Sequence, residues 1–175
     1  MTRPIALLLL ALSGACGGAS EDESGARTGA AQGGGGSDSA FAAMQARGAS
    51  PRAMGVDQYT SSHRFEALPD GGRIELQRDV DDPEGVEQIR THLRAIATAF
   101  AAGDFTIPGF VHDRIEVPGT TRMRERREAI RYDFRELPRG GEVLLRSDDP
   151  EAVRAIHEFL TFQRTDHRTH GMGGH

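Results

Sequence analysis

Residues 65–76 read FEALPDGGRIEL, and residues 134–145, sixty-nine positions later, read FRELPRGGEVLL. Both stretches hold Phe, Leu-Pro, Gly-Gly and a final Leu at the same spacing. After a slip of two positions the likeness resumes, because Asp82-Pro83 and Asp149-Pro150 each precede an apolar stripe at helical spacing. Two copies with one slip predict a duplicated domain rather than a long array of repeats.

Each copy predicts a hairpin followed by a helix. Apolar residues alternate with polar ones around Phe65 and Ile74, as half-buried strands require. The Gly-Gly pair between them is expected to supply the positive φ angles of a tight turn. Asp before Pro is a preferred N-cap followed by a preferred first helical residue. The expected fold class is therefore α+β: duplicated β-hairpin–helix (ββα) units form a four-stranded antiparallel sheet with two main helices on one face.

The chain divides into four expected parts. Residues 1–15 form a signal peptide, 16–57 a lipidated cysteine and a disordered Gly/Ala/Ser tether, 58–167 the duplicated domain, and 168–175 a flexible His/Met tail. The copies span about 58–103 and 130–167, and the connector spans 104–129. A short helix at 40–47 is compatible with the tether. In the connector, Pro-Gly pairs at 108–109 and 118–119 predict turns, and a short helix is expected from Thr120 or Thr121 to Arg131.

The first sixteen residues carry the most specific signal in the chain. A short positive start precedes an apolar run too brief to span a bilayer, and small residues then lead to Cys16. The order Leu12-Ser13-Gly14-Ala15-Cys16 resembles the lipobox of bacterial lipoproteins, with Ser13 where the family has Leu. The resemblance implies cleavage after Ala15, lipid (palmitate) on Cys16, and membrane anchoring in the cell envelope on the extracytoplasmic side, at the outer membrane or facing the periplasm. Cleavage after Ala19, giving a soluble exported protein, is the alternative.

Composition excludes several classes of function. The net charge is −5 and all 21 basic residues are arginine, so no nucleic-acid partner is expected and lysine chemistry is absent. A single cysteine excludes an internal disulfide framework and a Cys-rich zinc site. The sequence contains no Gly-x-Ser-x-Gly motif and no Gly-rich nucleotide loop. We therefore expect the protein not to be an enzyme.

The copies disagree where the second helix carries polar side chains. Gln163 stands at the position of Ile96, and His167 stands at the position of Phe100. A polar side chain in a core position costs free energy unless it is bonded. Three interpretations stay open: a helix end in water, an internal hydrogen bond, or contact with a ligand. Two further histidines align with aromatic residues and are interpreted as structural or boundary positions: His63 with Tyr132, and His92 with Phe159.

Histidine and methionine supply the candidate metal ligands. His112 in the connector, with Met123 and a helix histidine, would form a nitrogen–sulfur site that suits copper. The tail adds His170, Met172 and His175, which suit copper or zinc. His157 and His167 are ten residues apart, about 15 Å along a helix, so they cannot share one ion. No cofactor is required, and histidines that hold no ligand are the alternative.

These patterns predict a non-enzymatic cell-envelope lipoprotein whose domain, displayed on a flexible tether, binds a ligand or a transition-metal ion. Its expected partners are the membrane, through lipid on Cys16, and another envelope protein. The alternative is a structural or assembly lipoprotein that docks an envelope protein through its sheet face. The candidate ligand or metal residues are His112, Met123, His157, Gln163, His167, His170, Met172 and His175.

Overall fold

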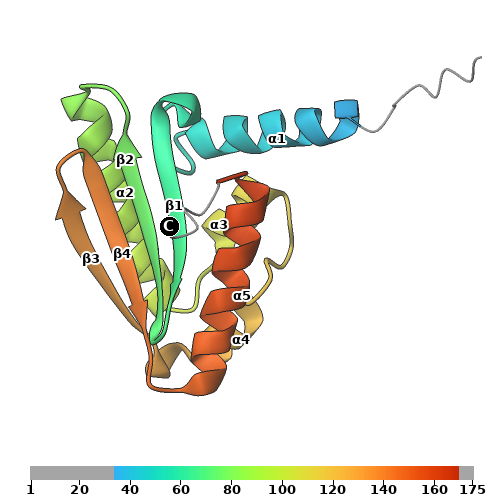
Figure 1. Ribbon diagram of the computed structural model, residues 1–175, viewed down its shortest axis with the longest axis vertical. Helices are drawn as coiled ribbons and strands as arrows, with labels where there is room; N and C mark the ends of the chain where they lie inside the picture. The colour runs from blue at the N-terminus through green and yellow to red at the C-terminus, as the bar shows by residue number, and fades with distance from the viewer. Residues whose placement is uncertain (1–33, 170–175) are drawn as a thin grey trace, which may run out of the picture. The chain divides into compact units, whose positions relative to one another are not determined.

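Four strands form one antiparallel sheet in the order β1-β2-β4-β3 (Figure 1). The first hairpin consists of β1 (Ser61–Leu68) and β2 (Gly71–Arg78), and the second of β3 (Arg131–Leu137) and β4 (Gly140–Arg146). This computed structural model describes residues 34–169. The α+β class and the four-stranded antiparallel sheet expected from the repeat are confirmed.

The strand register repeats with the sequence. Phe65 pairs with Ile74 in the first hairpin, and Phe134 pairs with Val143 at the equivalent place in the second. Ile74 and Val143 are also paired with each other across the centre of the sheet. Because these two are equivalent positions of the two copies, a pseudo-twofold axis passes through their pair. Both side chains are buried, so the core is centred on this axis.

The two main helices lie on the same face of the sheet, and each covers the hairpin of the other copy. Helix α2 (Pro83–Ala101), which follows the first hairpin, packs mainly on β3 and β4. Helix α5 (Pro150–Asp166), which follows the second hairpin, packs on β1 and β2. Both begin as expected, since Asp82 accepts the N–H of Gly85 and Asp149 accepts the N–H of Glu151. The exchange of helices interlocks the two copies.

The Gly-Gly pairs do not form the hairpin turns, so this expectation was wrong. Pro69 and Asp70 make the first turn, and both glycines after them lie within β2. Their small size serves helix packing instead: a Cβ at Gly72 would overlap Cδ1 of Leu160 in α5. At the equivalent place, a Cβ at Gly141 would lie 3.2 Å from Cδ1 of Leu93 in α2. Each glycine thus admits a leucine from the other copy's helix.

The connector contains two short helices, α3 (Thr106–His112) and α4 (Thr120–Glu125), and a 3-10 turn η2 (Arg127–Ala129). The expected turn at 108–109 is wrong, because both residues lie inside α3. The helix that begins at Thr120 ends at Glu125 rather than at Arg131. Among residues 34–169, no helix is long and apolar enough to cross a membrane.

Part of the expected tether is folded. Helix α1 (Gly34–Ala49) and the 3-10 turn η1 (Gln58–Thr60) precede the sheet and belong to the same folded unit as the duplicated domain. The reason is burial of apolar side chains, since Met44, Met54 and Val56 are at most 7% exposed. The remainder of the expected tether, with the signal peptide and Cys16, lies outside the described residues.

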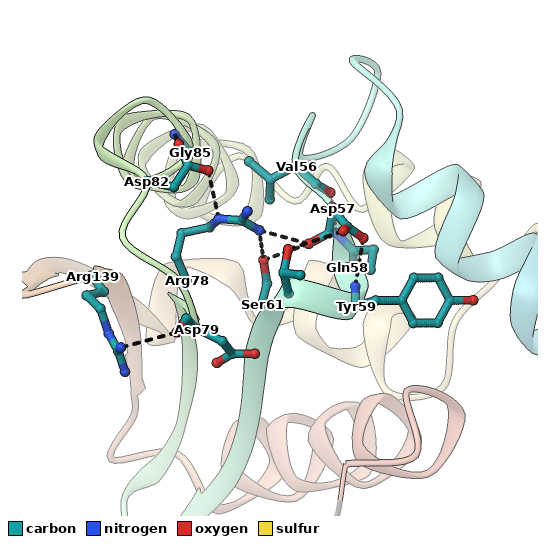
Figure 2. A network of polar contacts seen from close by, with 11 residues as sticks. Val56, Asp57, Gln58, Tyr59, Ser61, Arg78, Asp79, Asp82, Gly85 and Arg139 are labelled. Carbon is teal, nitrogen blue, oxygen red and sulfur yellow. Dashed lines mark hydrogen bonds and ion pairs between the residues drawn. The ribbon is translucent and has the colours of Figure 1, made fainter.

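A buried arginine joins the start of β1 to the start of α2 (Figure 2). Arg78, 6% exposed, donates from Nη1 to the carbonyl of Asp57 at 3.0 Å and to Ser61 Oγ at 2.7 Å. Its Nε donates to the N-cap carboxylate of Asp82 at 3.0 Å. Ser147 is the equivalent residue of the second copy, and its hydroxyl donates to the carbonyl of Ala129. Both residues fix a strand end to the chain that precedes the hairpin.

The contact between Gly72 and Leu160 predicts a measurable coupling. We expect Gly72→Ala to destabilise the fold by about 2 kcal/mol through overpacking, and Leu160→Ala by about 2–5 kcal/mol through the cavity it leaves. Because the smaller side chain makes room for the added methyl, the double variant should lose at least 1 kcal/mol less than the two single losses together. Urea unfolding of the four proteins measures this, and strictly additive losses would contradict the packing described.

Candidate functional site: a histidine-lined cavity

A cavity of about 90 Å³ lies between the sheet and the N-terminal segment. Its wall is mainly apolar and includes Phe65, Leu76 and Phe100. Four imidazoles interrupt this apolar wall, and we call the space the histidine cavity. They belong to His63, His92, His112 and His167.

Three of these imidazoles are in contact although they come from distant parts of the chain. His63 lies on β1, His112 ends α3, and His167 caps the C-terminal end of α5. The rings of His63 and His167 are stacked, with centroids 5.1 Å apart and planes 18° apart. The His112 ring meets His167 edge-on, with centroids 5.0 Å apart. The exchange of helices is what places the end of α5 beside β1.

The end of α5 is fixed by a turn with a left-handed residue. The N–H of His167 donates to the carbonyl of Gln163 at 2.9 Å, and Arg168 follows with φ of 53°. A non-glycine residue adopts this conformation at a cost of about 1 kcal/mol. The Arg168 guanidinium lies over the Phe41 ring of α1 and donates to Asp38 at 3.0 Å. The residue that follows α5 therefore binds α1 and fixes the two helices relative to each other.

His112 connects the histidine cavity to a carboxylate. Its side chain is 1% exposed, and Nδ1 lies 2.5 Å from Asp166 Oδ2. Its Nε2 lies 2.9 Å from Oε1 of Gln163. Both ring nitrogens of His112 therefore have hydrogen-bond partners. The amide nitrogen of Gln163 is buried and has no partner within residues 34–169, so the cavity wall contains an unused donor.

Burial keeps three of the four cavity histidines, His63, His92 and His167, uncharged. Loss of solvent lowers the pKa of His63 to about 4, with a smaller contribution from neighbouring His92. Burial also lowers the pKa of His167 well below its usual value, and His63 and His112 lower it further. The pKa of His92 is lowered by burial as well. Near pH 7 these rings are neutral, so each has a nitrogen lone pair able to bind a proton donor or a metal ion.

The other copy shows what these positions look like without imidazoles. Tyr132 and Phe100, the counterparts of His63 and His167, also form an aromatic pair, with centroids 6.0 Å apart. Ile96, the counterpart of Gln163, is a buried core residue. Apolar side chains and a phenol ring thus fill these positions, although the Tyr132 hydroxyl is buried without a partner among residues 34–169. The polar set distinguishes one copy from the other.

Three residues expected from the sequence meet at the cavity, namely His112, Gln163 and His167. Gln163 is 4% exposed, so the α5 end is not in water there. Met123 is fully buried in the core and does not line the cavity. Cys16, His170, Met172 and His175 lie outside the described residues.

His157 has a structural partner away from the cavity. Its Nε2 lies 2.8 Å from the carbonyl oxygen of Leu68. At the equivalent place, Arg90 donates to the carbonyl of Leu137 at 2.9 Å. Both side chains therefore bind a helix to the end of the hairpin beneath it. The His157 imidazole and the Arg90 guanidinium make equivalent contacts in the two copies.

Sequence reasoning did not select His63, His92 or Met54, all of which line the cavity. The available signal was that imidazoles replace aromatic residues of the other copy at several aligned positions. Within residues 34–169, no three histidine, cysteine or acidic side chains already stand around one point as a bound metal would require. The stacked rings of His63 and His167 face each other, so their nitrogens do not converge as they stand.

The lowered pKa of His63 predicts a loss of stability in mild acid. The unfolded chain binds the His63 proton near pH 6.5 and the folded protein near pH 4, so the unfolded state holds more protons between these values. The free energy of unfolding should fall as pH drops from 6.5 to 4, by roughly 2–3 kcal/mol from this residue.

Urea unfolding between pH 7.5 and 4 measures the effect. In His63→Tyr, which copies Tyr132, this part of the pH dependence should vanish, while His157→Arg should retain it. The titratable groups that face His63 are His92, Asp79 and His167, whose ring is stacked on it. Identical pH profiles for wild type and His63→Tyr would contradict the prediction.

The most informative comparison for this site lies inside the chain, between an imidazole-bearing copy and an aromatic copy of the same unit. Outside the chain, no protein-family model, no curated protein and no solved structure matches it.

Proposed function

We propose that this protein is a non-enzymatic, cell-envelope binding protein whose histidine cavity takes up a transition-metal ion, copper or zinc. The observation that carries the proposal is the contact of His63, His112 and His167 in one buried cavity. Imidazole is a ligand that suits both metals. The aromatic pair of the other copy supports the proposal, because it makes a packing role for the imidazoles unnecessary.

The size of the cavity favours an ion over an organic cofactor. Sites for small organic molecules usually enclose about 300–1,000 Å³, whereas this cavity has about 90 Å³. Such a space accommodates an ion with a few small ligands. The stacked rings of His63 and His167 would have to turn so that their nitrogens face the same point.

His112 has the surroundings of a metal-binding histidine. Metal-bound imidazoles usually donate their second N–H to a carboxylate, which fixes the ring and raises its basicity. Asp166 occupies this place at Nδ1. Loss of the Nε2 proton would then present a lone pair toward the cavity, and Gln163 would turn its amide to donate elsewhere.

An open groove lies next to the cavity. The groove, of about 660 Å³, lies between α1 and the ends of α3 and α5, and His112 lines both spaces. Asp113 and Asp166 also line the groove, and the Asp166 side chain is 38% exposed. Arg47, Arg114 and Arg168 line the same groove, so its charged side chains are of both signs.

Docking of an envelope protein through the open sheet face has less support. The face opposite the helices carries Arg73, which is ion-paired with Glu66, Glu75 and Glu142. A partner covering this surface would have to remove water from these charges, which costs free energy unless the new contacts are well matched.

Metal titration tests the proposed site. The protein without residues 1–16 is used, with His170→Ser, Met172→Ser and His175→Ser to remove the tail ligands. Zinc or cuprous ion at about 100 times its Kd should stabilise the fold by about 2.7 kcal/mol, which raises Tm by roughly 5–10 °C. The double variant His63→Tyr and His167→Phe, which copies the other copy's aromatic pair, should fold and lose this rise.

His157→Arg is the matched control, because it removes an imidazole outside the cavity and copies Arg90. It should keep the full thermal shift. The proposal fails if neither metal stabilises the wild type, or if the aromatic double variant is stabilised equally.

Attachment to the envelope is tested at Cys16. We infer from the sequence that a lipid on this residue anchors the protein, so labelled palmitate should be incorporated and the protein should sediment with membranes. Cys16→Ser should abolish both signals. A Cys16→Ser protein that still sediments with membranes would exclude the lipid anchor.

A further inference from the structure

A sulfur-bearing side chain lines the histidine cavity. Met54 is 7% exposed and forms part of the cavity wall, between α1 and η1. A compact turn holds it there: its N–H donates to the carbonyl of Gly48 at 3.1 Å, and Gly55 N–H donates to the carbonyl of Ser50 at 3.1 Å. Gly55 has φ of 79°, which favours glycine and lets the chain reverse directly after Met54.

We propose that the ion is Cu(I), and that the Met54 thioether completes its ligand set beside the imidazoles of His63, His112 and His167. This inference rests on the proposed function and specifies the ion that the site selects. Thioether is a soft ligand that favours Cu(I), whereas magnesium, calcium and manganese prefer carboxylate and carbonyl oxygen. The sulfur therefore distinguishes copper from the harder cations.

The absence of acidic side chains from the described part of the cavity wall also favours Cu(I). The cavity wall contains no aspartate or glutamate among the described residues, and Asp166 lies behind His112 rather than in the wall. The four ligands are neutral when they bind, so nothing in direct contact compensates the charge of the ion. The free energy needed to remove an ion from water grows with the square of its charge. At equal size, desolvation of a divalent ion therefore costs about four times as much free energy as desolvation of Cu(I).

The other two buried methionines are poor candidates and therefore useful controls. Met123 is fully buried in the core and absent from the cavity wall. Met44 lies in α1 and lines the outer groove instead. A ligand role should depend on Met54 alone, whereas a general effect of methionine on stability would appear in all three variants.

Competition with a colorimetric Cu(I) chelator under reducing, oxygen-free conditions measures Cu(I) affinity, and a fluorescent zinc chelator measures zinc affinity. The protein is again the chain without residues 1–16 and with the tail ligands replaced. Met54→Leu keeps volume and apolar character. It should weaken Cu(I) binding at least tenfold and change zinc binding less than twofold. Met44→Leu and Met123→Leu should leave both affinities within twofold of the wild type.

X-ray absorption at the copper edge supplies a readout that packing alone would not change. The wild type should show a sulfur scatterer bound to copper, and Met54→Leu should show only nitrogen. Unchanged Cu(I) affinity in Met54→Leu, or an equal loss of Cu(I) and zinc affinity, would overturn the role of Met54 while leaving the metal site intact. Absence of binding of either metal to the wild type would instead overturn the proposed function itself.

Discussion

The packing of Leu160 against Gly72, and of Leu93 against Gly141 at the equivalent place, is the constraint on which the rest of the structure depends. A glycine in the strand lets the helix approach closely, and the leucine comes from the helix of the other copy. This contact holds α5 over β1 and β2 and α2 over β3 and β4. If each helix lay on its own hairpin, the end of α5 would be beside Tyr132 rather than His63, and the histidine cavity would not form.

The repeated sequence was sufficient to predict the fold class, the four strands and the N-caps at Asp82 and Asp149. Local chemistry decides these features, because strand alternation and capping depend on nearby residues. The exchange of helices was not predictable, since either hairpin offers the same apolar face to either helix. The Gly-Gly pairs were misread for a related reason: glycine permits both a tight turn and a close approach, and only the tertiary contact distinguishes the two uses.

Helix α1 shows the limit of composition as a guide. A Gly- and Ala-rich segment buries little apolar surface by itself, so a disordered tether was a reasonable expectation. Contacts far along the chain supply what the segment lacks: Arg47 donates to the carbonyl of Val111 at 2.8 Å, and Arg168 lies over Phe41. Neither contact leaves a sign in the local sequence. The place of Met54 in the cavity wall likewise depends on this folded segment and leaves no sign in the local sequence.

The two ring pairs that the pseudo-twofold axis relates are covered differently. Phe105 of the connector packs on Phe100, whereas His112 of the connector and residues 48–58 close over His63 and His167. Together, His112 and residues 48–58 remove the imidazoles from water. Buried imidazoles and the unpaired amide nitrogen of Gln163 weaken this part of the core. Ile96 and Phe100, the counterparts of Gln163 and His167, are buried apolar residues that line the same cavity, so the apolar core continues around its polar side and the duplicated domain tolerates these groups.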